Sequence, residues 1–503
     1  MSQEKKIREK KKPTLLHAVI PLLGLLVCLG GGYAYLKLPT QVCLLAAAAV
    51  AAVVAWSLGL SWDDMVAGMT EKVTASFGSI MVMICVGAMI SSWMFSGTIP
   101  MMIYYGIKLI DPRFLFVTGF LVCAIISTFT GTSFGSAGTA GVAVMGVAIA
   151  TGAPLPITAG AVISGAVFGD KLSPFSDTTM LAPIAAGCDI YDHIRHMFYT
   201  TGCATILSLI VYGAVGFTLP ASSISSPELV SQMLGTLESM FHFNLLLLLP
   251  PVIVLLGAFL RKPTVPVMLF ASVLSIIMGC VFQGFPFKTA AAAFYSGFNV
   301  SMVPGVDPST VIPQINTLLN RGGLMGMMST ILLIFCAFAF GGIYSKSGCI
   351  QVILEKIAGC IRSVGSLIAS TVVSTIFMSI VTGSSYLAIL VPGEMFSEPF
   401  ERFGLHKKNL SRTLEDAGTC VVPLVPWAVA GTYMATTLGV PTVQYLPWAV
   451  SPLKSTSGAS IFATAALKNA SHAPLVFRQS LFRPRPLRLS KTGRPRCQTG
   501  TWI

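Results

Sequence analysis

The stretch ISGAVFGDKLSPFSDTTMLA, from Ile163 to Ala182, places charged and hydroxyl side chains inside an otherwise apolar region of the sequence. Its charged residues are Asp170, Lys171 and Asp177, with Pro174 between the two acids. A charge near the middle of a bilayer costs roughly 2.5–3.5 kcal/mol on insertion scales, so such residues are rarely kept there without a function. Proline removes a backbone donor and clashes with the preceding turn. The stretch therefore predicts a membrane helix that is broken at its centre.

The composition of the whole chain agrees with a membrane protein. Of its 503 residues, 54% are hydrophobic and 10% are charged, whereas a soluble globular chain carries about 25% charged residues. We predict an all-α, polytopic membrane helix bundle of about 10–13 spans, because apolar stretches long enough to cross a bilayer recur along the sequence. These stretches lie near residues 15–36, 41–60, 78–95, 114–134, 136–152, 157–186, 194–219, 243–260, 265–282, 324–343, 366–386, 414–437 and 441–466.

The formal net charge of +13 resides at the two ends of the chain. Residues 1–12 hold six Lys/Arg against two Glu, a net charge of +4, and residues 417–503 hold nine Lys/Arg and no acid, a net charge of +9. The stretch between them is neutral, so we do not interpret the charge as a nucleic-acid surface. A Lys/Arg-rich N-terminus stays on the cytoplasmic side of a membrane, and we expect that orientation here.

The sequence offers no pattern for a resident metal, a cofactor or an enzymatic reaction. Its 12 cysteines are scattered without a C-x-x-C pair, so neither a zinc site nor a disulfide framework is indicated. H-E-x-x-H and Walker A motifs are absent as well. His193 and His196 stand three residues apart in a polar segment at 189–196, which we expect to be a cytoplasmic loop, and no third ligand is spaced for zinc. We predict a transporter rather than an enzyme.

The two halves of the chain share landmarks in the same order. The segment SGTIPMMIYYGIKLI at 96–110 resembles SGCIQVILEKIAGCI at 347–361, and TGTS at 130–133 resembles TGSS at 382–385. Self-similarity of this kind indicates an internal duplication. About seven spans separate the matched elements, and an odd number makes the repeats inverted; paired interrupted segments in two such halves point to the binding site of a transporter. Basic residues lie at the end of both matched segments and just after them (Lys108 and Arg113, Lys356 and Arg362), which argues against inversion, and this conflict stays open.

We therefore expect three regions along the chain. Residues 1–14 form a basic cytoplasmic N-terminus, residues 15–470 a transmembrane transporter domain, and residues 471–503 a basic, proline-rich tail that is disordered or aberrant. Within the transporter domain, repeat 1 spans about 78–219 and repeat 2 about 324–466, as the matched landmarks require.

The second half repeats the combination of an acid, a hydroxyl and a proline-broken apolar stretch. Glu415 and Asp416 precede Thr419, and Pro423 and Pro426 follow. Intramembrane carboxylates of this kind are candidates for ion binding. The alternative for both acidic segments is a water-exposed loop that caps two helices. In the second half, Lys407, Lys408 and Arg412 favour such a loop.

Two hydroxyl-rich segments, TGTS at 130–133 and TGSS at 382–385, supply further oxygen ligands for a hard cation. Their alternative role is close helix packing, for which small residues are well suited. The residues predicted to bind the ion or carry the proton are Asp170, Asp177, Ser173, Thr178, Asp416, Thr130, Thr132, Ser133, Thr382 and Ser384, with Lys171 as a charge partner.

The segments FGDKLSPFSDTT (168–179), SGTIPMMIYYG (96–106) and GTSFGSAGTAG (131–141) resemble the NhaC family of Na+/H+ antiporters. The resemblance covers roughly residues 15–450. It implies a multi-pass protein of the cell inner membrane that exchanges Na+ for H+, and some members of the family couple this exchange to organic anions such as malate and lactate. The matching motif positions carry this role onto Asp170, Asp177, Ser173 and Thr178.

Our first hypothesis is Na+/H+ exchange by competition of the two ions for intramembrane carboxylates. The alternative is a Na+-coupled antiporter or symporter for carboxylates such as malate or lactate, which should show a buried arginine or anion-binding helix N-termini; the core of the sequence presents no clear candidate. A channel or an intramembrane enzyme is the third class, but no selectivity repeat or nucleophile–base pair is evident. The expected partners are Na+, H+ and the lipid bilayer, and a homodimer stays open.

Overall fold

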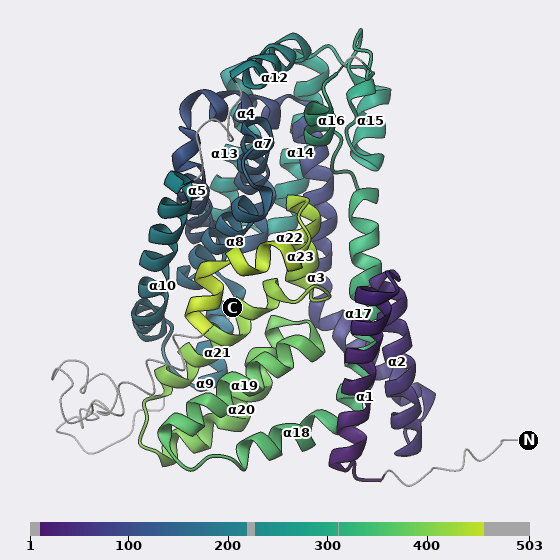
Figure 1. Cartoon of the computed structure of the whole chain (residues 1–503), viewed down its shortest axis with the longest axis vertical. Coiled ribbons are helices and arrows are strands. Elements are labelled where there is room, and N and C mark those ends of the chain that lie inside the picture. Colours follow the sequence, from purple (N-terminus) through teal and green to yellow (C-terminus); the bar gives the residue numbers. More distant parts are fainter. Residues whose placement is uncertain (1–10, 219–226, 310, 457–503) are drawn as a thin grey trace, which may run out of the picture.

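The computed structural model describes residues 11–218, 227–309 and 311–456, and this part of the chain folds into helices without strands (Figure 1). Nine of the described helices are long and apolar enough to cross a membrane, or up to eleven spans if two bent helix pairs are counted as one span each. The predicted all-α bundle with broken helices is confirmed. The basic tail expected at 471–503 and most of the expected N-terminal region lie outside the described residues.

The helices follow one another in three groups along the chain. The first group is α1 (Leu15–Val27), α2 (Thr40–Ser57), α3 (Trp62–Phe95), α4 (Thr98–Leu109), α5 (Leu115–Thr130), α6 (Ser133–Ser136), α7 (Val142–Thr151), α8 (Leu155–Leu172), α9 (Asp177–Ala186) and α10 (Ile190–Thr218). The second is α12 (Pro227–Met240), α13 (Leu249–Phe259), α14 (Thr264–Phe282), α15 (Phe287–Ser296) and α16 (Pro313–Leu319). The third is α17 (Met328–Lys346), α18 (Cys349–Ala358), α19 (Val364–Thr382), α20 (Ser385–Arg402), α21 (Lys407–Val421), α22 (Val429–Leu438) and α23 (Thr442–Tyr445).

Several predicted boundaries are wrong because polar residues interrupt the apolar stretches without interrupting the helix. Helix α3 begins at Trp62 rather than near residue 78, since a capping box between Ser61 and Asp64 starts it and Lys72 is buried along it. The loops expected at 189–196 and around Lys407 are the first turns of α10 and α21. The span expected at 441–466 is not continuous: it begins with α23 and a 3-10 turn, and its end lies outside the described residues.

The duplication has a clear counterpart in the backbone. Gly97 ends α3 and Gly348 ends α17, and both adopt left-handed conformations with φ of 85° and 76°. Gly131 after α5 and Gly383 after α19 do the same, with φ of 65° and 63°. Glycine is the residue that reaches this conformation without strain. Helices α4 and α18, which follow the first pair, lie at opposite ends of the molecule (Figure 1), as an inverted repeat requires. The repeat boundaries themselves stay predictions.

Helices α5 and α8 lie side by side through two small residues one turn apart. A Cβ atom at Gly165 would lie 2.1 Å from the carbonyl oxygen of Phe120, and one at Gly169 would lie 2.3 Å from that of Ala124. The Ser127 hydroxyl also donates a hydrogen bond across the contact to the Ala166 carbonyl at 2.6 Å. Small residues at this spacing let the backbones of membrane helices approach closely. The position of the end of α8, which carries Asp170, therefore depends on this contact.

Substituting Gly165→Ala tests this contact. The added methyl group meets backbone rather than a movable side chain, so the helices must separate, and overpacking of this kind costs about 1–3 kcal/mol. The expected result is a lower melting temperature of the purified protein in detergent. Gly202→Ala on α10 is the matched control, because a Cβ atom there has nothing within 4 Å. Equal melting temperatures for the two variants would contradict the close approach of α5 and α8.

Candidate functional site

The first acidic segment folds as a broken helix. Helix α8 ends just before Pro174, residues 173–176 leave the helical conformation, and α9 starts directly after them. The Ser176 hydroxyl accepts from the Thr179 backbone N–H at 3.5 Å and caps α9. The Thr179 hydroxyl donates to the backbone carbonyl of Asp170 at 3.1 Å. Side chains around the break thus satisfy part of the backbone that the proline releases.

Two of the left-handed glycines, Gly131 and Gly383, each pack against a helix break in their own half. A Cβ atom at Gly131 would lie 2.7 Å from the carbonyl carbon of Phe175, within the break between α8 and α9. A Cβ atom at Gly383 would lie 3.3 Å from the Cα atom of Ala428, within the break between α21 and α22. The Gly383 carbonyl also accepts from the Val429 N–H at 3.1 Å, at the start of α22. The same arrangement of a glycine turn and a broken helix therefore occurs twice.

A cavity of about 220 Å³ lies between these turns and breaks, and both halves contribute to its wall. Its lining is rich in oxygen. Seven of the predicted ion-binding residues line it: Asp170, Asp177, Thr178, Thr130, Thr132, Ser133 and Ser384. The structure thus brings most of the predicted set to one place, although residues 130 and 384 are far apart in the sequence.

The two cavity carboxylates differ in environment. Asp170 is 8% exposed, and its Oδ2 atom accepts from the backbone N–H of Ser133 at 3.2 Å. Asp177 is exposed at the start of α9, and its Oδ2 atom accepts from the Tyr386 hydroxyl at 3.0 Å. An acid at a helix N-terminus is favourable because the helix dipole is positive there. Asp170 is therefore the buried acid of the cavity and Asp177 the accessible one.

Three predicted residues do not line this cavity. The Ser173 hydroxyl is buried and accepts from the Phe175 N–H at 3.3 Å, and the Thr382 hydroxyl donates to the Met378 carbonyl at 2.7 Å. Both side chains serve local hydrogen bonds at helix ends. The third residue, Asp416, is engaged by Lys171.

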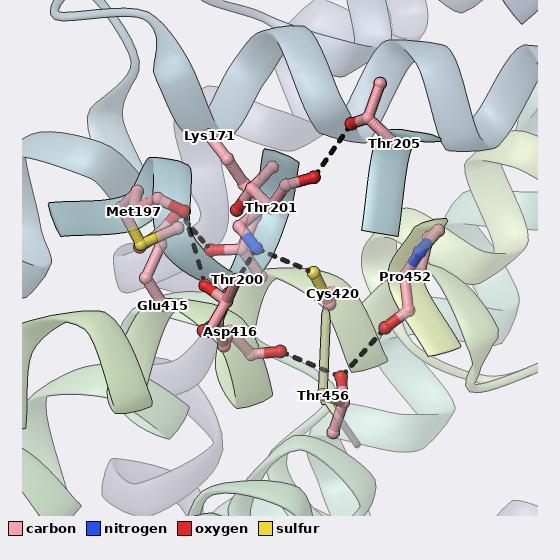
Figure 2. A network of polar contacts seen from close by, with 11 residues as sticks. Lys171, Met197, Thr200, Thr201, Thr205, Glu415, Asp416, Cys420, Pro452 and Thr456 are labelled. Carbon is pink, nitrogen blue, oxygen red and sulfur yellow. Dashed lines mark hydrogen bonds and ion pairs between the residues drawn. The ribbon is translucent and has the colours of Figure 1, made fainter. Parts of the chain in front are cut away.

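Lys171 and Asp416 form an ion pair in the interior. The Lys171 Nζ atom lies 2.6 Å from Asp416 Oδ1, and the two side chains are 1% and 0% exposed. The same Nζ atom is 3.3 Å from the Cys420 sulfur (Figure 2). Lys171 was predicted as a charge partner of the cavity acids, and the structure gives it a partner in the other half of the chain. This pair joins α8 of the first half to α21 of the second.

Three residues at the site were missing from the predicted set. Glu415 is fully buried, and its Oε1 atom accepts from the hydroxyl of Thr419, a cavity residue, at 2.8 Å. Its adjacency to Asp416 was the signal in the sequence. Tyr386 had no comparable signal. Arg412 is 4% exposed, so the conclusion that the core lacks a buried arginine was wrong. The neighbouring lysines at 407 and 408 had suggested a loop.

A second cavity of about 500 Å³ adjoins the first and shares Thr130, Thr132, Phe175 and Thr264 with it. Its wall is mainly apolar. The turn between α13 and α14 contributes two cations, Arg261 and Lys262, and the Arg261 guanidinium carbon lies 4.7 Å from the centre of the Phe175 ring. The break after α8 therefore separates an oxygen-rich cavity from an apolar one with a basic rim.

Residues 105–195 and 165–462 match the sequence model of the Na+/H+ antiporter family. The chain belongs to this family. A protein of Haemophilus influenzae described as an uncharacterized Na+/H+ antiporter is 44% identical to this antiporter over 440 residues, which cover 88% of this chain and 93% of the relative. The Na+/H+ antiporter NhaC of Alkalihalophilus pseudofirmus is 39% identical over 412 residues, 82% of this chain and 86% of the relative.

A third relative is described with a different function. The malate-2H+/Na+-lactate antiporter of Bacillus subtilis is 32% identical over 442 residues, which cover 88% of this antiporter and 92% of the relative. The family match and the NhaC relative confirm the resemblance to NhaC antiporters. Together with the apolar helices, they identify the chain as a multi-pass membrane protein.

The ion pair between Lys171 and Asp416 predicts a stability pattern. Asp416→Asn leaves a buried lysine without a counter-charge, which costs about 3–5 kcal/mol, whereas replacing both residues by apolar ones of similar size is often neutral. We expect the single variant to melt at a much lower temperature than the double variant Lys171→Met/Asp416→Leu, measured in detergent.

Asp307→Asn, on an exposed loop, serves as the control for loss of a carboxylate. If the double variant melts at a temperature no higher than that of Asp416→Asn, the unpaired lysine is not the cause of the lost stability.

Proposed function

We propose that this antiporter exchanges Na+ for H+ across the cell inner membrane by competition of the two ions for the carboxylates of the 220 Å³ cavity. The observation that supports the proposal is the position of Asp170. This acid is nearly buried, yet it borders a cavity at the meeting point of two helix breaks. In secondary transporters, broken helices expose carbonyl oxygens that coordinate Na+. Carboxylate and hydroxyl oxygens on the same wall complete a set suited to a hard cation.

Exchange follows from shared occupancy of this acid. Either a Na+ ion or a proton neutralises Asp170, and the charged, empty cavity is unfavourable to move through a membrane. Lys171 follows Asp170 in the sequence but is held by Asp416, so it does not supply the compensating charge to the cavity. A carrier that reorients only when loaded exchanges one ion for the other.

The orientation is part of the proposal. Lys11 and Lys12 precede α1, and the Lys/Arg content of residues 1–12 favours a cytoplasmic N-terminus by the positive-inside rule. A location in the inner membrane agrees with the bacterial relatives.

A second candidate function is Na+-coupled exchange of a carboxylate such as malate or lactate. Two observations favour it: the 500 Å³ cavity with Arg261 and Lys262 on its rim, and the malate/lactate relative. Ligand pockets of about 300–1,000 Å³ with apolar walls and a few charged groups suit small organic molecules. Addition of malate or lactate to the exchange assay separates the two candidates, because only the second predicts an increase in Na+ flux.

Asp170→Asn should abolish Na+-dependent proton movement, because the amide neither binds a proton at ordinary pH nor attracts Na+ as a carboxylate does. The measurement is dequenching of a pH-sensitive dye in everted membrane vesicles on addition of Na+. Membrane insertion should be normal, since the amide has the size of the acid. Asp307→Asn provides the control and should exchange normally. Normal exchange by Asp170→Asn would remove this acid from the mechanism.

Competition also fixes the pH dependence of Na+ affinity. Below the pKa of the site, each decrease of one pH unit should raise the apparent dissociation constant for Na+ about tenfold per competing proton. This factor corresponds to roughly 1.4 kcal/mol. Above that pKa the constant should level off while exchange slows, because protons no longer reload the site. Initial rates at varied Na+ concentration, measured from about pH 6 to 9, provide the test. A constant that does not change with pH would exclude direct competition.

A further inference from the structure

Unpartnered polar atoms gather where α10 packs against α21. Among the described residues, eleven buried side-chain nitrogen or oxygen atoms have no hydrogen-bond partner in the protein. Six of them belong to these two helices: His193 Nε2, His196 Nδ1, Thr201 Oγ1, Arg412 Nε, Glu415 Oε2 and Asp416 Oδ2. Buried polar groups nearly always have a partner, from protein or from ordered water. The concentration of exceptions along one interface points to a ligand that binds there.

Helix α10 has its polar side inward. His193, His196 and Thr200 follow one another at the spacing of a single helix face, and all three are at most 3% exposed. Its outward side carries large apolar residues such as Ile206 and Ile210, which are more than 60% exposed. Helix α21 is buried from residue 409 to residue 420, although seven of these twelve residues are polar or charged. The interface is therefore a polar column enclosed by apolar surface.

The column has an outer and an inner level. At the outer level, the His193 Nδ1 atom lies 2.7 Å from the Ser411 hydroxyl. At the inner level, Thr200 and Thr201 lie near Glu415, Asp416 and Lys171 (Figure 2). Ser411 and Glu415 are four residues apart on α21, about 6 Å along the helix axis. A single hydrogen bond of about 2.8 Å does not span one helical turn, so bridging water is needed to connect the two levels.

We infer that the α10–α21 column binds ordered water and carries protons between the surface end of α10 and Glu415. The exposed residues Asp192 and Arg195 stand at its outer end, next to the first buried histidine. At its inner end, Glu415 bonds to Thr419, which lines the ion cavity. Protons thus reach the site by a route separate from the cavity through which Na+ enters. The inference rests on the proposed Na+/H+ exchange and adds a second pathway to it.

The chemistry of the column suits proton transfer. A neutral imidazole has one donor and one acceptor nitrogen, so it takes a proton at one side and releases it at the other. The Ser411 hydroxyl is both donor and acceptor, so it extends the hydrogen-bond path from His193. The charged and titratable groups that face the two histidines come from three elements: Lys171 of α8, Lys408 and Arg412 of α21, and His406 before α21. Cys188, before α10, contacts Ser411.

The test separates proton flux from sodium flux in reconstituted vesicles. The double variant His193→Asn/His196→Asn should lose Na+-driven proton flux on the order of 100-fold, the lower end of what a positioned proton-transfer group contributes. Exchange of labelled Na+ for Na+ at the same pH should be unchanged, because that cycle needs no proton. His242→Asn, which alters an exposed histidine away from the column, is the matched control and should retain both fluxes.

A second variant controls for misfolding of the first. Thr201→Val removes one unpartnered hydroxyl and keeps the shape of the side chain. A hydroxyl that truly lacks a partner is replaced at no cost to stability, whereas one that binds water in the column lowers proton flux when removed. Reduced proton flux with unchanged Na+/Na+ exchange is the expected result here too.

The other outcomes overturn the inference. Unchanged proton flux in both variants means that protons do not use the column. Loss of both fluxes in Thr201→Val means that the column belongs to the Na+ pathway. If the unmodified protein exchanges Na+ for Na+ but moves no protons, the proposed function fails, and the column fails with it.

Discussion

Backbone groups released by a broken helix inside an apolar bundle must find new partners, and most of this site is organised around that constraint. No water is available in hydrocarbon to bind a free N–H or C=O group, so irregular backbone survives only where protein or a polar cavity surrounds it. Here the glycine turns at Gly131 and Gly383 lie against the two breaks, and a Cβ atom at Gly131 would overlap the backbone of Phe175. The same glycines end α5 and α19, which places hydroxyl-rich helix ends beside the acids. The oxygen-rich cavity is the space that these requirements leave.

The contact between α5 and α8 fixes the position of Asp170. Because Gly165 and Gly169 allow the two backbones to touch, the end of α8 is fixed relative to the turn that follows α5. Asp170 thereby receives the Ser133 N–H and remains at the cavity wall. Its neighbour Lys171 lies on another side of the helix and faces α21. One turn of α8 thus serves the cavity and the contact between halves at the same time.

The features that sequence reasoning found are those that depend on neighbouring residues. The break at Pro174, the acids beside it and the paired glycine turns follow from local chemistry. The partner of Lys171 could not be read in this way, because 245 positions separate it from Asp416 and only the packing of α8 on α21 unites them. The first turns of α21, at residues 407–413, were predicted as a loop for a related reason. Hydropathy measures exposure to lipid, and a polar helix enclosed by other helices lacks the apolar surface that such a measure detects.

The ion pair also makes the duplicated halves unequal. If Asp170 and Asp416 descend from one ancestral position, each half once offered the same acid to the interior. In the present chain, Lys171 from the first half neutralises the acid of the second, so a single member of the pair remains accessible from the cavity. The two halves then use their acids differently. The first half presents Asp170 to the cavity, whereas Asp416 of the second half holds Lys171 and so joins the two halves to each other.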